Sequence, residues 1–110
     1  MEIKVERYGQ AANLACKGEL NEDSLEVFGK EVEAQLADHV ADFILDLAEV
    51  TFVDSAGLEY LLDLQDRLAG NHGQITLTNL SENVAKVLEI TRLDKAFSIV
   101  GDTMEAIKAL

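Results

Sequence analysis

The chain has 110 residues, of which 48% are hydrophobic and only 5% aromatic, and this fits one globular domain with an aliphatic core. Its 21 acidic and 9 basic residues give a net charge of −12, so nucleic acids and anionic membranes are disfavoured as partners because phosphate groups repel such a surface. The single cysteine excludes an internal disulfide, and no segment approaches the roughly 20 apolar residues of a membrane span. With no N-terminal signal region either, we expect residues 1–110 to form one soluble, cytoplasmic domain.

The N-terminal segment, residues 3–18, predicts a β-hairpin. Ile3 and Val5 alternate with charged residues, and Ala12, Leu14 and Cys16 alternate again after a turn at residues 8–11. Because Cys16 takes part in this apolar alternation, we expect it to be a small buried core residue.

Residues 21–39 change to helical spacing. Side chains that would share one face recur every three or four residues, at Leu25, Phe28, Val32, Leu36 and His39. Asp23 followed by Glu26 is similar to a capping box and predicts the start of this helix.

The segment DFILDL, residues 42–47, is an apolar run typical of a central strand that is covered on both faces. Residues 56–69 return to the helical period, with one broad apolar arc formed by Gly57, Leu58, Leu61, Leu62, Leu64, Leu68 and Ala69. Glu59, Asp63 and Asp66 lie on the opposite face of this predicted helix, and Tyr60 lies at the edge between the two. Gly70 and the following Asn-His-Gly predict the helix end and a loop.

The C-terminal part continues this alternation of strands and helices. Residues 74–78 and 96–100 are predicted strands, and residues 81–91 form a predicted helix with Ser81 as its N-cap. Residues 102–110 predict a last helix with Met104, Ile107 and Leu110 on one side. The order β-β-α-β-α-β-α-β-α predicts an α/β fold, with an N-terminal hairpin, repeating βα units, and a mixed sheet of about five strands with about four helices.

Two common kinds of site are missing from the sequence. One Cys and two His, without C-x-x-C or H-x-x-x-H spacing, provide no transition-metal site. Neither G-x-G-x-x-G nor G-x-x-x-x-G-K-[ST] occurs, so no standard phosphate-binding loop is present, and we expect no cofactor.

The most informative segment is VDSAG, residues 53–57, at the junction between the predicted central strand and the next helix. We expect Ser55 to be the N-cap or a first-turn residue of that helix. A simple cap would not need Asp54 and Gly57 beside it. Gly57 in the first turn costs roughly 0.5–1 kcal/mol relative to Ala, and the close approach of another group would offset this cost.

Two enzyme classes are poor matches to this segment. A hydrolase elbow G-x-S-x-G would need a first glycine and a nearby histidine base. His39 ends a different helix, and His72 follows the far end of the helix that Ser55 opens, roughly 20 Å away. A phospho-acceptor Asp54, as in receiver domains, would need acidic residues after the first strand and a lysine after a later one, and neither is present. We therefore expect a protein that is not an enzyme.

The segment FILDLAEVTFVDSAGL, residues 43–58, resembles the signature of STAS domains, in particular of bacterial anti-sigma factor antagonists. In that family an apolar strand and a short loop lead to D-S-[ST]-G-[LIV] at the start of a helix. GELN, residues 18–21, is similar to the family's G-E-L-D, and TRLDKAFSIV, residues 91–100, is similar to its segment before the last helix. The matching segments follow one another in the family's order along nearly the whole chain.

The resemblance implies that the phosphorylatable serine of the family is Ser55, with its glycine at Gly57 and its aliphatic residue at Leu58. The second hydroxyl position is Ala56 here, which leaves Ser55 as the only acceptor in the motif. The aspartate of G-E-L-D is replaced by Asn21, which loses a charge and puts the choice or affinity of the partner in question.

The family mechanism is partner switching. The unphosphorylated domain binds an anti-sigma factor, itself a serine kinase of the histidine-kinase-like ATPase fold, and so frees a sigma factor. The kinase phosphorylates the serine, the complex separates, and a serine phosphatase resets the switch. The alternative that the family offers is an interaction module of a stress-signalling or lipid-transport complex, in which the serine is not modified.

The partner-binding surface implied here comprises Asn21, Asp54, Gly57, Leu58, Glu59 and Tyr60. Tyr60 belongs to it as an aromatic anchor beside the helix start, and Glu59 as an exposed rim charge. For Tyr60 the alternative is a ring that lies over the edge of the core with its hydroxyl group in water.

Overall fold

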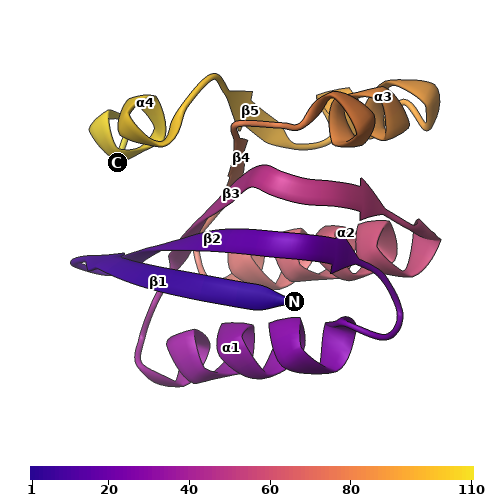
Figure 1. The fold of residues 1–110 in the computed structure, drawn as a ribbon. Coiled ribbons are helices and arrows are strands. Elements are labelled where there is room, and N and C mark those ends of the chain that lie inside the picture. The colour runs from indigo at the N-terminus through magenta and orange to yellow at the C-terminus, as the bar shows by residue number, and fades with distance from the viewer.

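The computed structural model describes residues 1–110 and has an α/β fold with one five-stranded sheet (Figure 1). The strands are β1 (Glu2–Tyr8), β2 (Ala11–Leu20), β3 (Asp42–Val53), β4 (Ile75–Thr78) and β5 (Ser98–Val100), and they are neighbours in that order. The helices are α1 (Leu25–Ala37), α2 (Ser55–Gly70), α3 (Glu82–Ile90) and α4 (Thr103–Lys108), with a short 3-10 helix, η1 (Leu93–Lys95). The predicted fold class and order of elements are confirmed.

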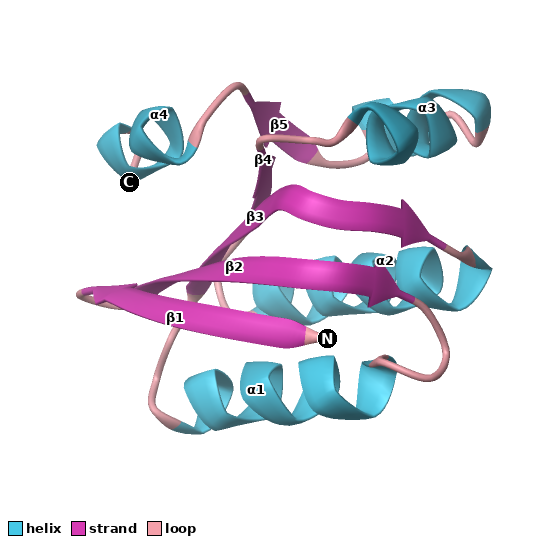
Figure 2. Cartoon of the chain, viewed as in Figure 1, coloured by secondary structure: helices cyan, strands magenta, loops and turns pink.

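The sheet is mixed because β1 and β2 form an antiparallel hairpin whereas β2, β3, β4 and β5 run parallel. Each parallel connection passes through a helix that packs back onto the sheet. Figure 2 shows α1 and α2 beneath β2 and β3, with α3 and α4 on opposite sides of β4 and β5. Phe43, Ile44 and Leu45 of β3 are all buried, so this central strand is covered on both faces as predicted.

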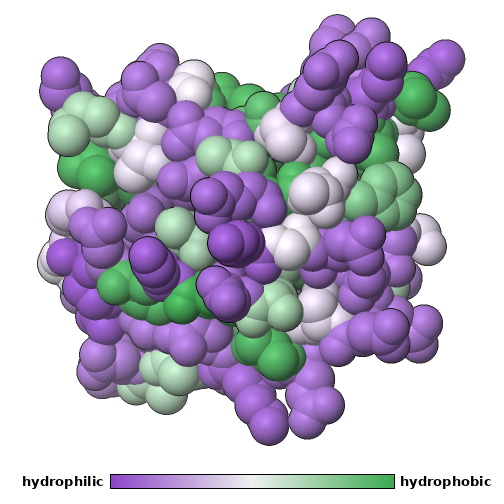
Figure 3. Space-filling model, in the orientation of Figure 1, coloured by the Kyte–Doolittle hydropathy of each residue, from purple (hydrophilic) through white to green (hydrophobic).

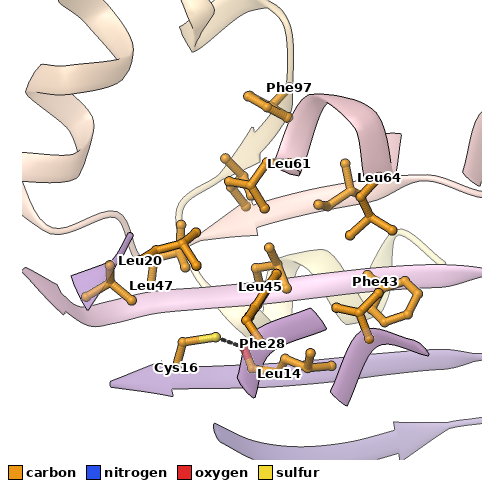
Figure 4. Packing of buried hydrophobic residues seen from close by; sticks show 14 of the residues in the cluster. Leu14, Cys16, Leu20, Phe28, Phe43, Leu45, Leu47, Leu61, Leu64 and Phe97 are labelled. Atoms are coloured by element: carbon orange, nitrogen blue, oxygen red, sulfur yellow. Dashed lines mark hydrogen bonds between the residues drawn. The ribbon is translucent and has the colours of Figure 1, made fainter. Parts of the chain in front are cut away.

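The core lies between the sheet and the apolar sides of α1 and α2. In Figure 4, Phe28 of α1 lies near Leu14 of β2 and Leu45 of β3, and Leu61 of α2 belongs to the same buried cluster. Cys16 belongs to the same cluster and is only 3% exposed, and its Sγ donates to the Leu14 carbonyl oxygen at 3.6 Å. Burial, with a smaller contribution from the charge of Asp46, raises the pKa of the Cys16 thiol to about 12. The prediction of a buried, structural cysteine is confirmed.

Two predictions about α1 are wrong. The helix begins at Leu25 after Ser24, and no side chain caps it, so Asp23 and Glu26 do not form a capping box. The Ser24 side chain is engaged in the preceding loop instead. His39 lies beyond the helix in a turn with a φ of 67°, so it is not part of the buried helical face.

The last helix also differs from its expected packing. α4 buries Ala106, whereas Met104 and Leu110 are exposed. In α3, by contrast, Ser81 is the N-cap as predicted, and its side chain accepts from the Val84 amide.

The outer surface is largely hydrophilic on the face shown in Figure 3, with smaller apolar areas between the polar groups. None of the helices combines the length and the apolar character that crossing a membrane requires.

Candidate functional site

Asp54 and Ser55 lie where β3 ends and α2 begins. Asp54 is the N-cap: its Oδ1 accepts from the Gly57 amide at 2.8 Å, and its carbonyl accepts from the Leu58 amide at 3.0 Å. Ser55 is the first helical residue and is exposed. Of the two positions expected for Ser55, the first-turn position is therefore the observed one, and its hydroxyl is not needed as a cap.

Gly57 is buried because the end of β2 passes directly over it. A Cβ atom on Gly57 would lie 2.6 Å from the Leu20 carbonyl oxygen and 3.0 Å from Val53 Cγ1. The close approach expected at this glycine is present, but the approaching group is the protein's own strand. Gly57 thus allows the ends of β2 and β3 to pack against the first turn of α2.

Asp54 also ties the β2–α1 loop to this junction. Its amide donates to the Leu20 carbonyl at 3.1 Å, and its Oδ2 accepts from the Glu22 amide at 3.3 Å. One carboxylate therefore satisfies backbone donors from two separate segments of the chain. The loop with Asn21 and Glu22 is brought beside Ser55, although more than thirty residues separate them in the sequence.

Asn21 is held inside its own loop. Its Oδ1 accepts from the Ser24 amide at 3.0 Å, and its Nδ2 donates to Glu19 Oε2 at 3.2 Å. Ser24 Oγ completes the turn by donating to the Glu19 carbonyl at 2.8 Å. An aspartate at position 21 would place a second carboxylate against Glu19, so the amide removes a local repulsion.

The remaining predicted surface residues differ in exposure. Leu58 is only 7% exposed and belongs to the core cluster, whereas Glu59 is exposed. Tyr60 is half-buried, and its ring meets Phe28 edge-on with centroids 5.5 Å apart. Burial raises the pKa of the Tyr60 phenol above its ordinary value. Tyr60 therefore rests on the core edge, and part of its side chain stays accessible.

The surroundings of Ser55 lack the partners of a nucleophile. His72 lies in the turn beyond the other end of α2, and His39 follows α1. No group of three or more His, Cys, Asp or Glu side chains is arranged to hold a metal ion. The geometry offers an exposed hydroxyl at a helix start, and both histidines lie at the opposite ends of the helices from it.

Replacement of Asp54 tests the junction. Asp54→Ala should lower the free energy of unfolding by about 1–2 kcal/mol, the range for loss of an N-cap, because it also frees the Glu22 amide. Asp54→Asn is the matched control: its carbonyl oxygen can still accept from Gly57, so less than half of that loss is expected. Urea unfolding followed by circular dichroism measures both. Equal losses in the two variants would show that the negative charge, and not the cap geometry, stabilises the junction.

The sequence pattern did not indicate that Glu22, Leu25 and Asp63 would lie near Ser55, where they help to line a surface groove. These residues lie on α2 and on the loop and first turn of α1, and a groove forms only where the two segments meet. No local pattern in the sequence marks such a meeting.

The family model and the curated relatives that match this chain agree with one another. A family model described as "Mlab, STAS domain" matches residues 3–101. A STAS-domain containing protein of Pseudomonas aeruginosa (strain UCBPP-PA14) is 39% identical over 57 residues, which are 52% of this chain and 56% of that protein. A Bordetella bronchiseptica protein named as an anti-sigma factor antagonist, BtrV, is 28% identical over 97 residues, which are 87% of this chain and 84% of that protein.

Solved structures share the whole fold. A Thermotoga maritima protein named as an anti-sigma factor antagonist gives a TM-score of 0.88 at 24% identity and covers 97% of this chain and 92% of its own. The anti-sigma factor antagonist SpoIIAA in its unphosphorylated form gives 0.82 at 22% identity, with 98% and 95% covered. Bacillus SpoIIAA in its phosphorylated form gives 0.75 at 21% identity, with 98% of both chains covered. Because these structures are less than 25% identical to this chain, the likeness shows a shared fold alone.

Proposed function

Because this chain belongs to the STAS domain family, we propose that it is an anti-sigma factor antagonist whose unphosphorylated form binds a serine-kinase anti-sigma factor. In this mechanism the kinase, of the histidine-kinase-like ATPase fold, transfers the γ-phosphoryl group of ATP to Ser55 Oγ, and the complex separates. A serine phosphatase hydrolyses the phosphate ester and restores the binding form. The chain supplies the acceptor and the docking surface, and the kinase and phosphatase supply the catalysis.

The observation that carries this proposal is the exposed Ser55 hydroxyl at a helix start that is capped by another residue. No side-chain hydrogen bond engages Ser55 Oγ, whereas the hydroxyls of Ser24 and Ser81 donate to backbone carbonyls at 2.8 Å and 2.6 Å. A phosphate on Ser55 would lie near the free amides of the first turn and the positive end of the helix dipole. The domain can therefore carry the modification without losing a structural hydrogen bond.

We assign the partner surface to the partly or fully exposed residues around Ser55. Asn21, Asp54 and Glu59 lie on the rim, and Tyr60 offers the accessible part of an aromatic ring. Gly57 and Leu58 are buried beneath this surface and fix the position of the helix start. Their burial supports an indirect role in partner binding.

Intact-mass analysis tests the acceptor assignment. Incubation with the cognate kinase and ATP should add one phosphate, and Ser55→Ala should abolish the addition, because Ala56 leaves no second hydroxyl in the motif. Ser98→Ala, which removes another exposed serine, should leave the mass increase intact. A phosphate that maps to Ser24, Ser81 or Ser98 would contradict the assignment.

A second candidate function is an interaction module of a stress-signalling or lipid-transport complex, in which Ser55 is not phosphorylated. The match to the family model described as "Mlab, STAS domain" favours it. Protein isolated from its native cells distinguishes the two functions. A phosphorylated fraction on Ser55 supports the switch, and its absence under all growth conditions supports the permanent module.

A further inference from the structure

A groove of about 440 Å³ lies beside Ser55, between the start of α1 and the first turns of α2. Six residues line it: Glu22, Leu25, Ala56, Glu59, Tyr60 and Asp63. Three are apolar or aromatic and three carry carboxylates, so the groove combines an apolar lining with negative charge. Ala56, the residue after Ser55, places it directly against the proposed phosphorylation site.

The carboxylates of the groove form no ion pair within the chain, so they can bind a cation of another molecule. The ion pairs of the chain use other acidic residues, namely Asp38, Glu26 and Glu33. Glu22, Glu59 and Asp63 are all exposed, and none of their carboxylates accepts a hydrogen bond from another side chain. Three like charges around one groove repel one another, and a bound cation would relieve this repulsion.

We propose that this groove binds an arginine side chain of the partner protein. The inference rests on the proposed function, because it takes the occupant to be a protein that docks over Ser55. A guanidinium group has five donors in a planar fork and can serve more than one carboxylate. Its flat face can stack on the accessible part of the Tyr60 ring, and its methylene stem can cover Leu25 and Ala56.

Arginine fits better than lysine for a geometric reason. An ammonium group is a compact and strongly hydrated point charge, and it cannot stack flat on an aromatic ring or present a rigid planar fork of donors to several carboxylates. The edge-on packing of Tyr60 against Phe28 fixes the Tyr60 ring before any ligand arrives. Such preorganisation lowers the entropic cost of binding.

A short peptide tests the groove without the kinase. The probe is the N-acetylated, C-amidated tripeptide Ala-Arg-Ala, titrated into the 15N-labelled unphosphorylated protein and followed by two-dimensional NMR. We expect saturable shifts of the amides of Leu25, Ala56, Glu59 and Tyr60. The same peptide with citrulline, a neutral isostere of arginine, should bind at least tenfold more weakly, and the lysine peptide should lie between the two.

A pair of charge-matched variants completes the test. Glu59→Gln combined with Asp63→Asn should weaken the arginine peptide at least tenfold. Glu89→Gln combined with Asp94→Asn removes the same number of charges from exposed positions on α3 and η1 and should leave binding within twofold.

Equal binding of the arginine and citrulline peptides would overturn the proposal, as would shifts spread over the whole acidic surface. Equal weakening by both pairs of variants would also overturn it. Failure of this test leaves phosphorylation of Ser55 untouched, because the titration involves neither kinase nor ATP. Failure of phosphorylation would leave the peptide result unchanged.

Discussion

Phosphorylation of Ser55 is expected to weaken binding of the serine-kinase anti-sigma factor several hundredfold, by about 3–4 kcal/mol. The modification adds about −1.5 to −2 charges to a side chain that is exposed in the free domain. A partner that packs closely on Ser55 would have to remove water from this phosphate, and that desolvation sets the cost. An arginine in the neighbouring groove does not offset it, because the carboxylates there already hold the cation. Titration calorimetry with the two forms of the protein measures the difference.

The stability of the fold should change little when position 55 carries a negative charge. Ser55→Asp is expected to unfold within about 1 kcal/mol of the wild type, because an acidic residue in the first turn of α2 is favoured by the helix dipole and Asp54 keeps the cap. The same variant should lose kinase affinity. Ser98→Asp adds an equal charge to an exposed position on β5 and should bind normally. Normal binding by Ser55→Asp would place the interface elsewhere.

Gly57→Ala should lower the free energy of unfolding by about 1 kcal/mol, although alanine is the better helix former. The added methyl group would lie 2.6 Å from the Leu20 carbonyl oxygen, a backbone atom that cannot move without shifting the end of β2. Overpacking of this kind typically costs 1–3 kcal/mol, which exceeds the roughly 0.5–1 kcal/mol gained from helix propensity. Chemical denaturation of both proteins measures the effect.

Gly70 provides the matched control in the same helix. A Cβ atom there would meet no atom within 4 Å, so Gly70→Ala should be neutral or stabilise the fold by up to about 1 kcal/mol. If Gly57→Ala is as mild as Gly70→Ala, the end of β2 can yield and the junction is less rigid than its contacts suggest. In that case kinase binding by Gly57→Ala should also be normal.

The elements that depend on local pattern were predictable from the amino-acid sequence. The alternation around Cys16, the apolar run of β3 and the 3.6-residue period of α2 each specify a strand or helix and the face that it buries, because these periods follow from backbone geometry. Ser81 was recognisable as a cap because a cap is a local hydrogen bond. The place of Ser55 between β3 and α2 was predictable for the same reason.

Features that depend on contacts between distant segments became visible only in the folded chain. The reason for Gly57 is a carbonyl from β2, and the second role of Asp54 is an amide in the loop before α1. The groove exists because that loop and α1 lie beside α2, and its carboxylates come from two separate stretches of sequence. Periodicity says which face of a helix is buried, but it does not say which backbone atoms come to lie against that face. For this protein, local pattern predicts a serine at a helix start, whereas the groove beside that serine exists only because distant segments pack together.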